Sequence, residues 1–228
     1  MSTDHGGPTV RRRPLDRHIA TEGHRPIERL SPDDAVTLAT DVGPLPMHVG
    51  AVLVLDERLE LDRLVGRVEE RLPAVPRLRQ RLLRTPLFGG RAVWVDDDRL
   101  DLGRHLSEAP QGAADLDELT RVALATIGRR FEPDRPLWRL QLVRLADGRA
   151  ALVVAFHHVL ADGIGGLAVL AALVDDADVP PSDPSFPRPR PTGSQLRRDA
   201  ARTRLATVLH PGAPLRRSFD ALAQLRPT

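Results

Sequence analysis

An unbroken apolar stretch covers residues 151–156 and runs directly into His157 and His158. An unbroken apolar run with two valines and a phenylalanine is typical of a strand covered on both faces. A second apolar and alternating run, residues 137–145, precedes it across Asp147-Gly148. The pattern predicts an antiparallel hairpin with a type I′ turn, and it places the two histidines at the end of a buried strand.

Other segments show helical or strand-like spacing. Residues 31–34 read Ser-Pro-Asp-Asp and predict a helix start, with a serine cap, proline at the first helical position and acids in the first turn. Residues 61–72 and 115–131 repeat apolar side chains on one face and predict amphipathic helices. Residues 47–55 are apolar nearly throughout and predict a strand, and residues 194–209 are a further helix candidate.

Charged residues cluster in two places within this pattern. Residues 77–84 carry four arginines beside leucines that share one helical face, so the arginines are interpreted as a solvated face. Contacts with CoA phosphates or lipid headgroups are the alternative. Residues 91–95 predict a short strand that leads into three aspartates, residues 96–98. These are interpreted as a turn rather than a metal site, because no ordered ligand spacing follows.

Composition divides the chain into three parts. Residues 1–25 are rich in Gly, Pro, Arg and His and predict a disordered tail. Residues 26–178 hold the strands and helices and predict one α/β (α+β) domain. Residues 179–228 open on a proline-rich linker and continue as a basic amphipathic segment. Such a segment suits either an anionic membrane surface or a solvated connector.

Overall composition narrows the functional classes. The 228 residues are 41% hydrophobic and 28% charged, as in ordinary globular proteins. The net charge is only +2, and the pI of about 10.5 reflects arginine without lysine or tyrosine, so it does not indicate nucleic-acid binding. The absence of cysteine excludes disulfides, thiolate metal ligands and an acyl-cysteine intermediate. With no secretory signal or membrane-spanning stretch in view, the expected location is the cytoplasm, with the inner membrane or lipid bodies as a peripheral alternative.

The pattern His-His-x-x-x-Asp-Gly at residues 157–163 carries the candidate chemistry. Consecutive side chains of a strand point to opposite faces, so the two histidines are expected to differ in role. One can act as a base, because histidine titrates near neutral pH and can take a proton from an alcohol. The other is expected to hold the turn, and Asp162 to fix the loop by hydrogen bonding or by pairing with an arginine. A metal site at His157, His158 and Asp162 is an alternative, but opposite strand faces make joint ligation by the histidines awkward.

This pattern resembles the HHxxxDG signature of the CoA-dependent acyltransferase superfamily, which includes the chloramphenicol acetyltransferase-like and condensation-domain proteins. Two further motifs, at residues 30–34 followed by 46–50 and at residues 135–138, are similar in sequence and order to those of bacterial wax ester synthase/diacylglycerol acyltransferases. The resemblance covers about residues 29–176. It implies a chloramphenicol acetyltransferase-like half, with a mixed sheet and flanking helices.

The resemblance also implies a reaction. A fatty acyl group would pass directly from acyl-CoA to diacylglycerol or to a long-chain alcohol, with no cofactor beyond the acyl-CoA substrate and no metal. The lack of cysteine and of Gly-x-Ser-x-Gly fits a mechanism without an acyl-enzyme. His158 would be the general base, supported by the geometry of His157, Asp162 and Gly163. The residues expected to line the substrate site are His48 and Trp138.

The family fold pairs two such halves around a channel, and this chain is expected to hold the first half with the crossover linker. A polypeptide carrying the second half, or another copy of the chain, is therefore an expected partner, while no nucleic acid is expected. A catalytically inactive half-domain that binds acyl-CoA, lipid or a partner acyltransferase is the alternative function. It predicts ligand binding without turnover.

Overall fold

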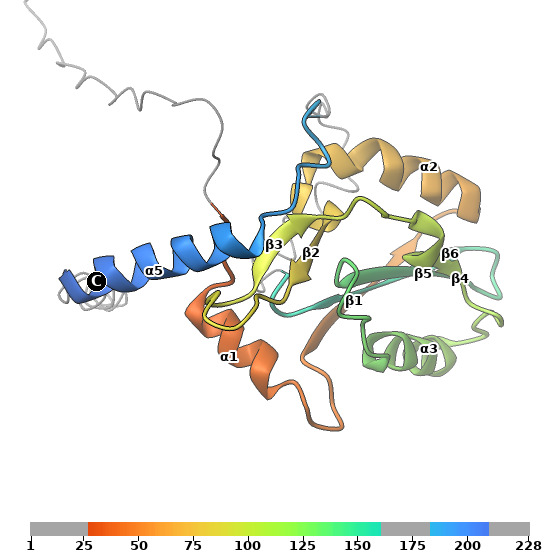
Figure 1. Cartoon of the computed structure of the whole chain (residues 1–228). Helices are drawn as coiled ribbons and strands as arrows, with labels where there is room; N and C mark the ends of the chain where they lie inside the picture. Colours follow the sequence, from red (N-terminus) through yellow and green to blue (C-terminus); the bar gives the residue numbers. More distant parts are fainter. Residues whose placement is uncertain (1–26, 161–182, 210–228) are drawn as a thin grey trace, which may run out of the picture.

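The computed structural model of the protein describes residues 27–160 and 183–209, and its centre is a four-stranded mixed sheet (Figure 1). The strand order is β1-β6-β5-β4, antiparallel at the first two junctions and parallel between β5 and β4. A separate antiparallel ribbon pairs β2 with β3. The strands are β1 (His48–Leu55), β2 (Gln80–Leu83), β3 (Val93–Asp96), β4 (Leu106–Glu108), β5 (Trp138–Arg144) and β6 (Ala150–His157).

The helices begin where the sequence pattern predicts them. Ser31 caps the first helix by accepting the N–H of Asp34 at 3.0 Å, and Asp115 caps α3 by accepting the N–H of Glu118 at 2.8 Å. The helix predicted for 115–131 ends earlier, because Arg129 has extended backbone angles. The helices are α1 (Pro32–Thr40), α2 (Leu61–Arg71), α3 (Leu116–Gly128) and α5 (Gly193–Leu209), with short 3-10 turns η1 (Leu72–Ala74), η2 (Pro76–Arg79) and η3 (Leu102–Arg104).

The predicted hairpin is confirmed, but its predicted turn type is wrong. β5 and β6 pair in register from Trp138 opposite Phe156 to Arg144 opposite Ala150. A type I′ turn needs positive φ at both central residues, whereas Gly148 has φ of 85° and Asp147 has no positive φ. The N–H of Leu145 donates to the carbonyl of Arg149, so three residues lie in the loop between these two, and the glycine takes the left-handed position.

Every residue of β6 is buried, as its unbroken apolar run predicts. Its two faces belong to different cores, and α2 and α3 lie on opposite sides of the sheet (Figure 1). Leu152, Val154 and Phe156 pack in the cluster that contains Leu64 and Val68 of α2. Ala151 and Val153 pack against Leu119 and Ala123 of α3. The mixed sheet with helices on both faces confirms the expected fold class, and it gives the end of β6 a rigid mount.

Of the four arginines of residues 77–84, Arg84 is exposed as predicted, but the other three do not form the solvated face that their spacing predicts. The segment folds as η2 followed by β2, so the helical pattern does not apply. Arg79 and Arg81 are buried, with the Arg79 guanidinium 3.9 Å from the centre of the Phe186 ring and Arg81 3.6 Å from Asp97. Arg77 lies over Trp94 at 4.2 Å. These side chains therefore belong to the packing of the ribbon and its neighbours.

The proline-rich segment after residue 182 lies against the β2–β3 ribbon. The Arg188 guanidinium donates to both carboxylate oxygens of Asp96, at 2.5 and 2.7 Å, and its backbone N–H donates at 2.9 Å. Two residues further along both segments, Arg190 forms an ion pair with Asp98. The predicted turn is present at Asp98, but Asp96 still belongs to β3, and Asp96 and Asp98 also form ion pairs that dock residues 188–190.

The helix predicted for residues 194–209 is present as α5, although its predicted apolar face is only partly buried. Leu196 packs on Val93 and Val95, whereas Leu205 and Val208 are exposed. Arg29 holds the start of the helix by donating to the carbonyl of Leu196 and to the carboxylate of Asp199. The basic segment is therefore attached to the domain at its beginning.

Asp96 gives a prediction for acid stability. Burial opposes its ionisation, but the side chain and N–H of Arg188 and the amide of Gln80 lower the pKa of Asp96 from 3.8 to about 2. A carboxyl group whose pKa is lower in the folded than in the unfolded protein stabilises the fold at pH values above its unfolded-state pKa. This stabilisation is lost as the pH falls through the folded-state pKa. We therefore expect the free energy of unfolding to fall between about pH 4 and pH 2. Urea titrations over this range should show a shallower fall for Asp96→Asn.

Candidate active site

The two histidines have different environments, as predicted, although only His157 lies on the strand and His158 follows it in a turn. His157 is the last residue of β6 and is only 3% exposed, whereas His158 begins the following turn and is exposed. The N–H of His158 donates to the carbonyl of Met47 at 2.9 Å, and the N–H of Leu160 closes the turn on the carbonyl of His157 at 2.9 Å. The backbone under His158 is thus fixed while its ring is open to solvent.

His157 is hydrogen-bonded at both ring nitrogens. Its Nδ1 lies 3.2 Å from the N–H of Val159, and its Nε2 lies 3.1 Å from the carboxylate of Asp41. Burial lowers the pKa of His157, against the opposing effect of Asp41, so the ring is neutral at neutral pH. A neutral ring that accepts at Nδ1 must carry its proton on Nε2, and it therefore donates to Asp41.

Asp41 is a site residue that the sequence interpretation missed. It follows α1 as its C-terminal cap, and its Oδ1 accepts the N–H of Met47 at 3.1 Å and an N–H of Arg130 at 3.2 Å. Burial would raise the pKa of Asp41, but Met47, His157 and Arg130 together hold it below its usual value. An aspartate before Val42-Gly43-Pro44 reads as ordinary turn chemistry, and no local pattern connects it with a histidine 116 residues away.

His48 on β1 is paired with His157 on the neighbouring strand β6, and the centres of their rings lie 5.6 Å apart in an edge-to-face arrangement. Its Nδ1 donates to the carbonyl of Ile127 at 2.7 Å, and its ring lies 4.3 Å from that of Phe131. Burial lowers the pKa of His48, and the Ile127 carbonyl opposes this. His48 therefore caps the C-terminal end of α3 beside the histidine pair, so the structure does bring this predicted site residue close to His157.

Arg139 completes the attachment of α3 at this end. Its guanidinium donates to the carbonyls of Thr126, Arg129 and Arg130 and lies 4.2 Å from the Phe131 ring. Burial, together with the nearby charge of Arg129, lowers the pKa of Arg139 to about 10, so it stays protonated at neutral pH. A cation near the last carbonyls of a helix stabilises its negative end.

Trp138 does not lie with the histidines. It pairs with Phe156, whose side chain is on the other face of the sheet from that of His157. It is buried, donates from Nε1 to the carbonyl of Leu78 at 2.8 Å, and stacks on His105 at 4.5 Å. The structure therefore does not bring Trp138 and His48, the two predicted lining residues, to one surface.

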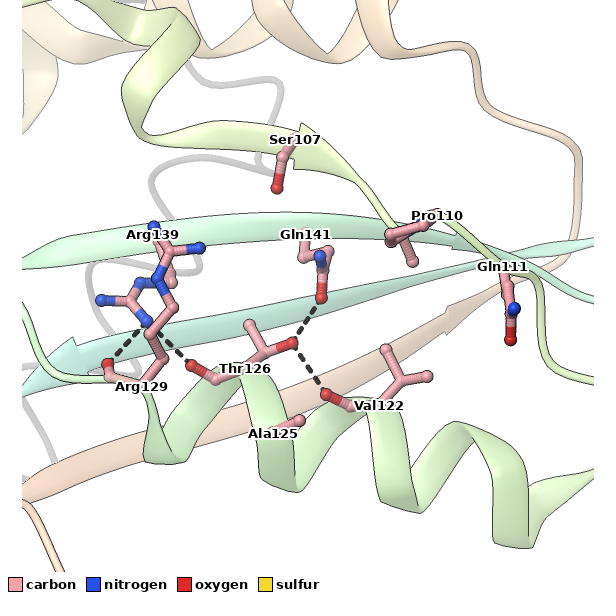
Figure 2. A pocket seen from close by; sticks show the side chains of 10 residues that line it. Ser107, Pro110, Gln111, Val122, Ala125, Thr126, Arg129, Arg139 and Gln141 are labelled. Atoms are coloured by element: carbon pink, nitrogen blue, oxygen red, sulfur yellow. Dashed lines mark hydrogen bonds between the residues drawn. The ribbon is translucent and has the colours of Figure 1, made fainter.

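A pocket of about 450 Å³ lies between α3 and strands β4 and β5 (Figure 2). Thr126 bridges the carbonyl of Val122 and the amide of Gln141 there, and Arg139 reaches across to the end of α3 (Figure 2). The predicted site residues that the structure describes are absent from the pocket lining. The pocket is therefore separate from the histidine pair.

Asp162 and Gly163, predicted to support the site, lie outside the described residues, and the same is true of the tail predicted for residues 1–25. Within residues 27–160 and 183–209, no cluster of three or more His, Asp or Glu side chains is arranged to hold a metal ion. In the same part of the chain, no helix has the length and apolar character needed to cross a bilayer.

Comparison with known proteins adds to this geometry. Residues 30–227 match the model of the wax ester synthase/diacylglycerol acyltransferase catalytic domain. The probable diacylglycerol O-acyltransferase tgs3 of Mycobacterium tuberculosis is 31% identical over 213 residues, which cover 87% of this chain and 75% of tgs3. The probable diacylglycerol O-acyltransferase tgs1 of the same organism is 33% identical over 134 residues, 58% of this chain and 29% of tgs1.

A solved structure shares the fold. The wax ester synthase/diacylglycerol acyltransferase from Marinobacter aquaeolei VT8 superposes with a TM-score of 0.55 at 26% identity, over 73% of this chain and 43% of that one. The chain thus spans less than half of that enzyme. The family match, the similar relatives and the shared fold confirm the resemblance carried by the three motifs. The chain belongs to the wax ester synthase/diacylglycerol acyltransferase family, an enzyme class that transfers acyl groups to oxygen.

Proposed function

We propose that this chain transfers a fatty acyl group from acyl-CoA to the hydroxyl of diacylglycerol or of a long-chain alcohol, with His158 as the general base. The observation that carries the proposal is the exposed His158 on a hydrogen-bonded turn directly after a buried strand. A base must reach its substrate and must also be held still, and this placement provides both.

The other described histidines are engaged within the protein. His157 is buried between Asp41 and Val159, and His48 donates to the carbonyl of Ile127. His105 is buried, bonds the carbonyl of Trp138 at 2.9 Å and stacks on its ring. Of the four histidines in the described ranges, His158 has the exposed ring that an incoming hydroxyl can meet.

The step balances without a covalent intermediate on the protein. The imidazole of His158 takes the proton from the acceptor hydroxyl as the oxygen attacks the thioester carbonyl. The tetrahedral oxyanion then collapses, the C–S bond breaks, and the leaving thiolate takes the proton back from the imidazolium. The products are an ester and free CoA. Orientation of both substrates and stabilisation of the oxyanion supply much of the rate in such reactions.

A partner belongs to the same proposal, because the family fold pairs two halves around a channel and the described residues form one such half. The remaining wall of the substrate channel would come from a polypeptide carrying the second half or from another copy of this chain. Acyl-CoA and a lipid acceptor would be presented in the cytoplasm or at the surface of the inner membrane or of lipid bodies.

The test is acyl transfer from labelled palmitoyl-CoA to diacylglycerol and, separately, to hexadecanol. We expect labelled triacylglycerol or wax ester together with an equal amount of free CoA. The reaction should be run with the chain alone and with the second half of the Marinobacter enzyme added. Bound palmitoyl-CoA without product in both cases would contradict the proposal and identify a binding half-domain.

A further inference from the structure

We propose that Asp41 is a positioning residue of this site, which holds His157 in one tautomer and thereby fixes the turn that carries His158. The inference deepens the proposed function and rests on it for the role of His158. It starts from a contact within the described residues that the family motifs do not include, the 3.1 Å hydrogen bond between Asp41 Oδ2 and His157 Nε2.

The two oxygens of Asp41 face different partners. Oδ2 meets the ring of His157, and Oδ1 meets the N–H of Met47 and the guanidinium of Arg130. Arg130 also donates to the backbone carbonyls of Asp41 and Gly43. The side chain is only 9% exposed, so water replaces little of this network. Asp41 therefore joins the end of α1, the start of β1 and the residues after α3 to the end of β6.

These contacts reach His158 through the backbone on both sides. Met47 uses its N–H to bind Asp41 and its carbonyl to accept the N–H of His158 at 2.9 Å. On the other side, His157 Nδ1 accepts the N–H of Val159 at 3.2 Å, the residue after His158. The loop of hydrogen bonds from Asp41 through Met47, His158, Val159 and His157 closes on itself. The two bonds made by the His157 ring, to Asp41 and to Val159, need its Nε2–H tautomer.

Asparagine cannot replace the carboxylate in this network. All the groups around Asp41 are donors: the His157 Nε2–H, the Met47 N–H and Arg130. An asparagine amide has one acceptor oxygen and one NH₂ group, so in either orientation a donor faces a donor. Glutamate keeps two acceptor oxygens and can restore the pattern if the loop yields by the length of one methylene group.

The experiment compares Asp41→Asn and Asp41→Glu with the unchanged chain, and Asp33→Asn is the matched control. Asp33 lies in the first turn of α1, the helix that Asp41 caps at its other end, and is exposed. Nitrogen-15 NMR of the imidazole rings reports the His157 tautomer without any need for activity. Steady-state kinetics with palmitoyl-CoA and the preferred acceptor separate kcat from KM.

We expect Asp41→Asn to lose the single Nε2–H form of His157 and to lower kcat by about tenfold with little change in KM. Asp41→Glu should recover part of both, and Asp33→Asn should match the unchanged chain. An unaltered His157 tautomer in Asp41→Asn, or a lower kcat without any change in that ring, would overturn the inference. If the unchanged chain has no turnover, the proposed function fails, while the tautomer still decides the role of Asp41.

Discussion

Replacement of His158 by alanine is expected to lower acyl transfer by about 10²–10⁴-fold, the usual contribution of a general base. The loss should appear in kcat, because the imidazole acts on the proton of the acceptor as the C–O bond forms. The fold should persist, since the ring is exposed and the backbone N–H that binds Met47 remains in alanine. Thermal unfolding and product formation, measured on the same preparation, check both parts.

His105→Gln is the matched control for this loss. It removes another imidazole, but one that is buried and stacked on Trp138, on the face of the sheet opposite His157. We expect it to lower the stability and to leave the turnover per folded molecule unchanged. A His158→Ala variant that keeps the turnover of the unchanged chain would remove the base from the mechanism, whatever the stability of either variant.

Replacement of Asp96 by alanine should cost about 3 kcal/mol of stability and release the segment around Arg188. The carboxylate is buried and accepts from the Arg188 guanidinium, the Arg188 N–H and the amide of Gln80. Alanine leaves these donors without their acceptor. Urea unfolding should give the free-energy loss, and limited proteolysis should show faster cleavage within residues 183–192.

Asp98→Ala provides the comparison for Asp96. Its pair with Arg190 has the same chemistry in the turn two residues beyond the end of β3, but both side chains are exposed. Exposed pairs contribute roughly 0–1 kcal/mol, so we expect a loss in that range and little change in proteolysis. Equal losses for the two variants would show that burial of Asp96 does not determine how strongly its ion pair with Arg188 stabilises the protein.

The parts of the fold that depend on neighbours in sequence were predictable. The caps at Ser31 and Asp115 need partners three residues away, and the hairpin of β5 and β6 needs a short loop between two apolar runs. The turn type was wrong because Asp-Gly suits several turns, and the choice depends on which residues pair beside it. The interpretation of Arg77, Arg79 and Arg81 as a helical solvated face is wrong, because this segment folds as a 3-10 turn and a strand.

The candidate site was predictable where a motif marks it and not where tertiary contacts build it. Strand alternation predicts different environments for the neighbouring histidines. The structure shows one buried and one exposed, but His158 lies in the turn that follows the strand. Asp41 and Arg130 could not be found, because they reach His157 from segments that are distant in the sequence and carry ordinary turn residues. Trp138 was expected near the histidines, but its register with Phe156 assigns it to the other face of the sheet.

The central claim is that His158 takes the acceptor's proton, and the pH dependence of kcat/KM tests it most directly. A general base must be unprotonated to act, so the rate should rise with pH along a single ionisation limb. The profile should be measured for the unchanged chain and for His158→Ala with the same acceptor. We predict that the limb is absent from the residual rate of the variant. If kcat/KM of His158→Ala still rises over the same pH range, the account is contradicted and the ionisation belongs to another group.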